Sequence, residues 1–200
     1  MAHFELHVTV EEHPTMKQAN DFASLCQTLG FKTNLIELSS GIFPLQLMMA
    51  TKYNREDDGK ALSYAMDVAG DFIARGWKPV RVKVETPVEA GTAAYYEAHW
   101  KFLIKTEEDR QNWDDFLKAR SWQSTHPEAF LVSKNLFKKG LFYLSSRIYN
   151  EPHWYANNMF TDTESCILRK SDLRKNLEGG HYERVVYDSN PQIDTGWTVS

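Results

Sequence analysis

The sequence predicts an α+β protein of two ferredoxin-like βαββαβ lobes, with antiparallel sheets and a polar cleft. One observation is a motif that recurs about ninety residues apart, because 4–10 and 96–102 both read aromatic, Glu, any, His, any, Thr or Lys, apolar. A second observation is a similar pair of segments, 49–54 and 145–150, each at the end of a β-prone run. Together they indicate an internal duplication with one copy of a polar site in each half.

The first half predicts a strand, a helix, a hairpin, a helix and a strand. Polar and apolar side chains alternate over 4–10, as in a strand with one buried face. Thr15 and Gln18 form a capping-box pattern before an amphipathic helix that ends at Gly30. The remaining elements are expected as a hairpin of strands 31–38 and 43–53, a helix over 58–75 and a strand over 79–85. This order is the ferredoxin-like plan.

The second half repeats that plan after a linker at 87–92. Thr106 and Asp109 open its first helix, and 152–177 should hold the second helix plus a polar insertion. Within that insertion, 157–164 is interpreted as a surface loop or a flap. Strands are expected at 93–104, near 129–135, at 140–149 and at 181–188. The predicted units are lobes 1–87 and 93–189 and an irregular tail, 190–200, with Trp197 as a docking anchor.

The composition restricts the class of protein. A hydrophobic content of 42% is enough for a buried core, and a net charge of -4 argues against a broad nucleic-acid surface. Two distant cysteines exclude a cysteine-rich zinc site and favour a reducing compartment. No run of apolar residues is long enough to span a membrane, so we expect a cytoplasmic protein. Motifs of dinucleotide-binding, P-loop, serine-hydrolase and zinc-protease sites are missing.

The repeated motif places matching polar side chains on one face of each strand. Residues at even spacing share a face, so His7 lies beside its neighbours at positions 5 and 9, and His99 beside those at 97 and 101. The apolar faces should be buried under helices, which leaves the polar faces to meet across a cleft. The residues expected there are Glu5, His7, Thr9, Glu11, Arg81, Lys83, Glu85, Glu97, His99, Lys101, Arg147 and Arg184.

These residue types suit acid–base chemistry on an anionic substrate. His7 and His99 can exchange protons near neutral pH, because an unperturbed imidazole titrates near 6.5. Glu5 and Glu97 can orient the two rings. Lysine and arginine side chains beside them would bind phosphate oxygens. The expected function is therefore binding, and hydrolysis, of a nucleotide or cyclic phosphodiester.

The sequence resembles the 2H phosphoesterases, which carry two H-x-(T/S) motifs in a duplicated bilobal fold. His7-Val8-Thr9 matches that motif, and His99-Trp100-Lys101 carries lysine in place of the hydroxyl residue. The resemblance implies His7 and His99 as general base and general acid, in either order. It implies Thr9 as a phosphate contact.

Two alternatives stay open. Each motif taken alone is common in sequences, so the chain also fits a non-catalytic ligand-binding or protein-interaction module. A metal-dependent enzyme is the other, since the two histidines with Glu5 and Glu97 could make a two-His, two-carboxylate site. The leading hypothesis needs neither metal nor cofactor, and it takes a small phosphate or nucleotide as partner. The oligomeric state is left open.

Overall fold

A computed structural model describes residues 1–11, 14–39, 43–88, 92–119 and 129–194 of the 200-residue chain. The strands are β1 Ala2–Val10, β2 Lys32–Leu38, β3 Leu45–Arg55, β4 Pro79–Pro87, β5 Tyr95–Leu103, β6 Ala129–Asn135, β7 Leu141–Ile148 and β8 Leu177–Asp188. The helices are α1 Met16–Thr28, α2 Asp58–Ala74, α3 Glu107–Ala119, α4 His153–Leu168, α5 Ser171–Arg174 and the short 3-10 helix η2 Pro191–Asp194. Trp197 lies outside the described residues.

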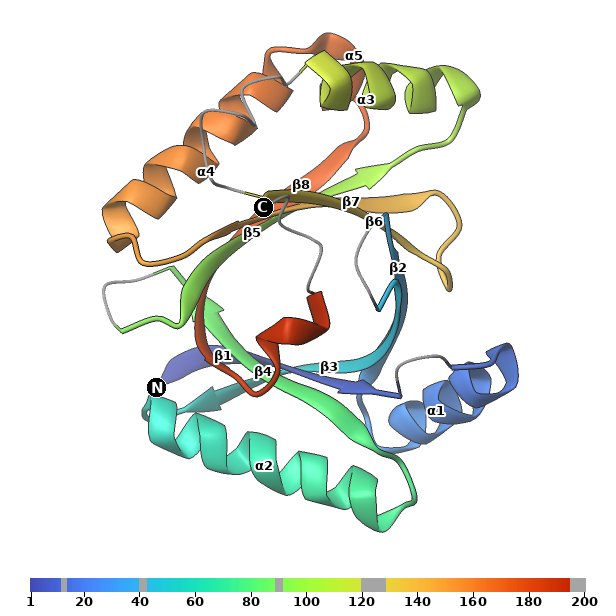
Figure 1. Cartoon of the computed structure of the whole chain (residues 1–200), viewed down its shortest axis with the longest axis vertical. Helices are drawn as coiled ribbons and strands as arrows, with labels where there is room; N and C mark the ends of the chain where they lie inside the picture. Colours follow the sequence, from blue (N-terminus) through green and yellow to red (C-terminus); the bar gives the residue numbers. More distant parts are fainter. Residues whose placement is uncertain (12–13, 40–42, 89–91, 120–128, 195–200) are drawn as a thin grey trace.

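The eight strands form one closed antiparallel barrel, in the order β1-β3-β2-β6-β7-β5-β8-β4 (Figure 1). The prediction of two separate ferredoxin-like lobes around a cleft is therefore wrong. Each half does keep its strands together, but β2 pairs with β6 and β4 pairs with β8. These pairings leave neither sheet with a free edge. An unpaired edge strand would leave backbone donors and acceptors without partners. The predicted boundaries at 87 and 93 remain a prediction.

The helices cover the outside of the barrel, so the apolar strand faces point outward. Figure 1 shows α1 and α2 against one side and α3, α4 and α5 against the opposite side. One core joins the apolar face of β1 and β4 to Phe22 and Phe72 of the first two helices. The other joins Trp100 and Phe102 of β5 to Phe160 of α4. Burial of the apolar faces under helices is confirmed, and the polar faces consequently turn into the barrel.

Two helices begin as their sequences predict. Thr15 and Gln18 form a reciprocal capping box at the start of α1. At the start of α3, Thr106 and Asp109 do the same, since each side chain accepts from the other's backbone N–H at 3.0–3.1 Å. The prediction of a loop or flap at 157–164 is wrong, because those residues lie within α4.

The end of the described chain turns into the barrel. Ile193 and Asp194 of η2 are buried, and Asp194 contacts side chains of β3, β4 and β7. Figure 1 shows this short helix within the outline of the barrel. Among the helices of the described ranges, none combines the length and apolar character needed to cross a membrane.

Candidate functional site

The barrel encloses a cavity of about 330 Å³ with two different walls. Strands β1, β4, β8 and β5, which are neighbours around the barrel, contribute most of its ionisable side chains. The other strands contribute an apolar patch, neutral polar groups and the charged side chains of Lys32, Lys52 and Arg147. The apolar lining residues are Ile36, Leu38, Met48, Ala50 and Leu131. The cavity can therefore hold an apolar body against one wall and an ionisable group against the other.

Each half of the chain contributes a histidine flanked by two carboxylates. His7 Nε2 lies 3.5 Å from Glu5 and 3.0 Å from Glu85. A second set, formed by His99, Glu97 and Glu183, has the same strand register. Glu5 pairs with Glu85 just as Glu97 pairs with Glu183.

In the second set, His99 Nε2 lies 3.6 Å from Glu97 and 3.9 Å from Glu183. Nδ1 of His99 lies 2.7 Å from Ser145 Oγ on β7. Both nitrogens of this ring are thus oriented by neighbouring side chains.

Buried cations balance most of the carboxylates. Lys83 Nζ lies 2.6 Å from Glu85 and 2.8 Å from Glu97, which links the two sets. Arg147 also contacts Glu97, at 3.0 Å, and reaches Asp194 at 2.7 Å. Such groups are stable inside a protein only when they are paired, because leaving water is costly for a charge.

Arg81 is engaged in the same way. Its guanidinium contacts Asp188 at 2.6 Å and Asp194 at 2.7 Å, and it donates to the Tyr95 hydroxyl at 3.0 Å. Gln46 donates to Asp194 at 2.8 Å. The side chains around Asp194 of η2 therefore form a charge-balanced network.

These surroundings separate the pKa values of the carboxyl groups. Burial by itself would raise the pKa of Glu97, but Arg147 and Lys83 lower it to about 2. Burial likewise opposes ionisation of Glu85, yet Lys83 and His7 hold its pKa well below the usual range. Burial and the charge of Glu85 raise the pKa of Glu183 well above the usual range, although Lys83 opposes the shift. Glu183 consequently keeps its proton to higher pH than an ordinary carboxyl group.

The surroundings of His99 favour its neutral form. Burial lowers the pKa of His99, and Lys83 adds to the effect, although Glu97 opposes it. The imidazole is therefore neutral at pH 7. A neutral imidazole beside an ionised carboxylate can accept a proton, and the carboxylate stabilises the resulting charge.

Glu85, His99 and Glu183 are the group best placed to surround a cation. Their nitrogen and oxygen atoms lie within 4.8 Å of one another. Lys83 already brings a positive charge to Glu85 at this point. The cluster thus combines an imidazole with Glu85, whose pKa is lowered, and Glu183, whose pKa is raised.

The structure brings together most of the residues that the sequence singled out. Those that line the cavity are Glu5, His7, Thr9, Arg81, Lys83, Glu97, His99, Lys101 and Arg147. Arg184 is not among them, since its guanidinium contacts Asp58 at the start of α2 and the carbonyl oxygen of Thr92.

Hydrolysis of a phosphodiester is nevertheless the wrong function for this cavity. Arg81, Lys83 and Arg147 are already held by buried carboxylates, so a phosphate would have to displace those partners. The hydrolase and phosphodiesterase interpretation is corrected accordingly.

Some cavity residues escaped the sequence prediction. They are His181 and Glu183 on β8, Ser145 on β7, Asp194 of η2 and Tyr143. His181 and Glu183 carried a usable signal, because they repeat the Glu and His types at a two-residue step in the last predicted strand. Asp194 carried none, since it lies beyond the last strand.

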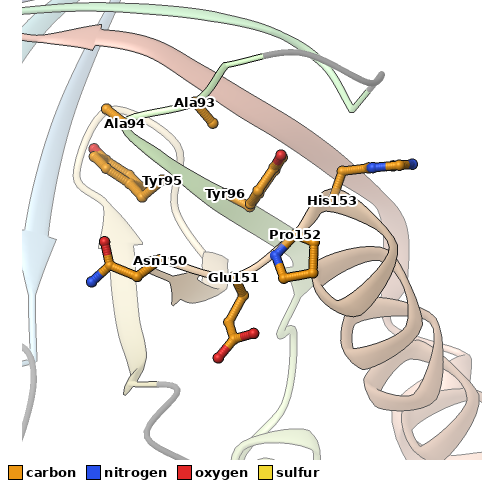
Figure 2. Close-up of a pocket in the computed structure, with 8 residues that line it drawn as sticks. All are labelled: Ala93, Ala94, Tyr95, Tyr96, Asn150, Glu151, Pro152 and His153. Atoms are coloured by element: carbon orange, nitrogen blue, oxygen red, sulfur yellow. The ribbon is translucent and has the colours of Figure 1, made fainter.

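A second pocket, of about 340 Å³, lies where β5 begins and the β7–α4 connection passes (Figure 2). Its lining includes Tyr95, Tyr96, Glu151 and His153. Glu151 and His153 are exposed, and Figure 2 shows them pointing in different directions. This pocket therefore lacks the converging ionisable groups of the barrel cavity.

Comparison with known proteins leaves the family open. No family model matches the chain, and no curated protein matches it. Among solved structures, a "putative monooxygenase" from Fusobacterium nucleatum is 10% identical over 97% of this chain and 94% of its own, with a TM-score of 0.36. An "anthrone oxidase-like protein" is 10% identical over 98% and 96%, at 0.33, and a "putative monooxygenase" from Lactobacillus acidophilus is 10% identical over 100% of both, at 0.34.

TM-scores this low carry no argument about the present chain. The 2H phosphoesterase resemblance is overturned by the fold, since its bilobal cleft is replaced by a closed barrel. The H-x-T match at His7 is thus an isolated tripeptide.

Proposed function

We propose that the barrel binds a small organic molecule with an acidic hydroxyl group on an apolar body, such as a phenol or an enol, and that His99 accepts its proton. The observation that carries this proposal is the division of one barrel cavity into an acid–base wall and an apolar patch. Pockets of 300–1,000 Å³ are typical of small-molecule sites, and this cavity lies at the lower end of that range.

The apolar patch supports a ring or hydrocarbon as the ligand's body. Leu131 and Ala50 are almost completely buried yet line the cavity, so they offer a dry surface. Burial of such a body stabilises the complex by roughly 25 cal/mol per Å² of apolar area. The acid–base wall then decides which polar group the ligand presents.

Proton transfer is supported by the two sets of carboxyl and imidazole groups. Neutral His99 is a base at pH 7, and Glu97 beside it favours the imidazolium form after transfer. Glu183 retains its proton more readily than an ordinary carboxyl group, which suits it to return a proton to the product.

The test uses 4-nitrophenol, whose neutral and ionised forms absorb differently, and 4-nitroanisole, which cannot ionise. We expect the parent protein to bind both probes and to lower the pKa of bound 4-nitrophenol. Leu131→Trp and Ala50→Phe should fill the cavity and abolish binding of both probes. Leu136→Trp, at an exposed position just after β6, is the matched control and should bind like the parent.

His99→Gln separates binding from proton transfer. It should retain 4-nitroanisole binding while bound 4-nitrophenol stays neutral at pH 7. Unchanged binding in both cavity-filling variants would reject the site. Equal ionisation of bound 4-nitrophenol in parent and His99→Gln would reject the role of His99.

A further inference from the structure

The two matched histidines differ in what their neighbouring strands place opposite them. His7 pairs with Ala50 on β3 and with Lys83 on β4. His99 occupies the equivalent place on β5 but pairs with Ser145 on β7 and His181 on β8. The duplicated site is thus chemically asymmetric, because a hydroxyl faces only the second imidazole of this pair.

The Ser145 hydroxyl lies beside His99, and both residues line the cavity. Ser145 Oγ lies 2.7 Å from His99 Nδ1, and Ser145 lines the cavity although it is only 5% exposed. Nε2 of the same ring faces Glu97 at 3.6 Å, so a proton on Nε2 is attracted to an ionised carboxylate. Nδ1 then carries the lone pair, and Ser145 donates its hydrogen bond to it.

The first half is arranged to hold charge. Lys83 stands where the second half has His181, and its ammonium group bridges Glu85 and Glu97. His7 Nε2 lies 3.0 Å from Glu85, which is completely buried. Ala50 offers no hydroxyl through which His7 could reach a ligand.

We propose that the Ser145 hydroxyl bridges the acidic oxygen of a bound ligand and Nδ1 of His99, so that the second half of the duplicated site moves the proton. The ligand's O–H bond breaks as its proton passes to Ser145 Oγ, while the serine's own proton forms the N–H bond at Nδ1. Serine is unchanged, the ligand becomes an anion, and His99 becomes an imidazolium beside Glu97. This inference rests on the proposed function.

The closing experiment compares titrations of bound 4-nitrophenol in the parent, Ser145→Ala, Ser145→Thr and Ser146→Ala. Ser146 is the matched control, because it is buried on the same strand but its side chain takes the opposite face. We expect Ser145→Ala to reduce the ratio of ionised to neutral bound probe about tenfold at pH 7. Ser145→Thr should restore the ratio, Ser146→Ala should leave it unchanged, and 4-nitroanisole should bind equally to all four proteins.

Two outcomes distinguish this inference from the proposed function. If the parent binds neither probe, the proposed function fails and the inference falls with it. If the parent ionises the probe and Ser145→Ala does so equally, the relay through Ser145 is rejected while the proposed function stands.

A second readout needs no ligand. The side-chain 15N spectrum of His99 should show a hydrogen-bonded Nδ1 in the parent and in Ser146→Ala, and should lose that signature in Ser145→Ala. An unchanged Nδ1 resonance in a folded Ser145→Ala protein would also overturn the inference. Ala50→Ser extends the comparison, since it should create the same signature at His7.

Discussion

Glu97 illustrates how individual side chains keep charge inside the barrel. It is 1% exposed and contacts Lys83 from β4 and Arg147 from β7. A carboxylate buried this deeply would be protonated without those cations, because burial disfavours the charged form. Its pKa of about 2 therefore reflects its partners.

Removing that charge should destabilise the protein strongly. We expect Glu97→Gln to lower the free energy of unfolding by about 3 kcal/mol, since two buried cations lose a shared partner. Lys17→Ala, which breaks an exposed pair with Asp21, is the control and should change it by less than about 0.5 kcal/mol. Urea unfolding followed by circular dichroism measures both. Equal small effects would show that the buried pairs contribute little.

Acid should unfold the protein through the same network. The pKa values of Glu97 and Asp194 are each about 2 in the folded chain, below those of free carboxyl groups. Their contribution is therefore complete above about pH 5 and is lost as the pH falls toward 2, because the unfolded chain binds protons first. Asp194→Asn should reduce the slope of stability against pH by up to about 1.4 kcal/mol per unit between pH 4 and 2. A slope unchanged from the parent would contradict this assignment.

Strand alternation predicted which side chains gather, but not how they pair. His7, His99 and their neighbours share faces because a strand has a period of two, and that period is visible in the sequence. The same period places Arg184 opposite in direction to Glu183, so its position outside the cavity was also open to prediction. The partners of Arg81 and Arg147 were not, since Asp194 reaches them from a segment more than forty residues away.

Among the elements, α1 shows a local signal that suffices. Its capping box depends only on Thr15 and Gln18, three positions apart, and the structure forms both reciprocal bonds. Such a cap satisfies backbone N–H groups that have no partner inside the helix. The start of this helix was accordingly predictable to the residue.

Loss of that cap should have a modest, measurable cost. We expect Thr15→Ala to lower the free energy of unfolding by about 1 kcal/mol. Thr28→Ala is the control, because its hydroxyl only returns to a carbonyl of the same helix and should have a smaller effect. Thermal melts followed by circular dichroism compare the two. A larger loss in Thr28→Ala would contradict the capping argument.

Helix α4 shows where composition misled. Its Asn, Thr and Asp residues are typical of loops, because their side chains compete with the backbone for hydrogen bonds. Yet Ala156, Phe160, Thr163 and Ile167 are buried at a helical spacing. That apolar stripe, packed against β5 and β8, outweighs the low propensity of the exposed face.

At the scale of the molecule, two seams close the barrel, β2–β6 and β4–β8, and the first is short. Strands β2 and β6 pair over three positions, whereas β1 and β3 pair over nine. Two backbone bonds, from Ser39 to Val132 and from Leu136 to Leu35, extend the seam. A short ladder opens at lower cost than a long one, so local opening should begin here.

Hydrogen exchange checks this expectation. The amides of Ser39 and Leu136 should exchange faster than those of β1, which has ladder partners on both sides. Amide exchange followed by NMR or mass spectrometry measures the difference under native conditions. Protection of the seam equal to that of β1 would contradict the proposed order of opening.

Closure itself could not be predicted from local patterns. Each half of the sequence contains a complete ferredoxin-like order, and nothing within 79–87 or 129–135 signals which distant strand will pair with its edge. The pairings join residues far apart along the chain, so they depend on how both sheets fit together. The charged strand faces gave a partial indication of closure. Their ion pairs are buried only if the two faces are enclosed together.

The two seams have a consequence for a polypeptide that contains only one half. A fragment of the first half would have bare edges at both sides of a four-stranded sheet, and Arg81 would lose Asp188 and Asp194. Two copies placed edge to edge would restore eight strands, with the seams as subunit contacts and two identical histidines in a common interior. In the present chain the residues opposite His7 and His99 differ, so the two histidine sites are not equivalent.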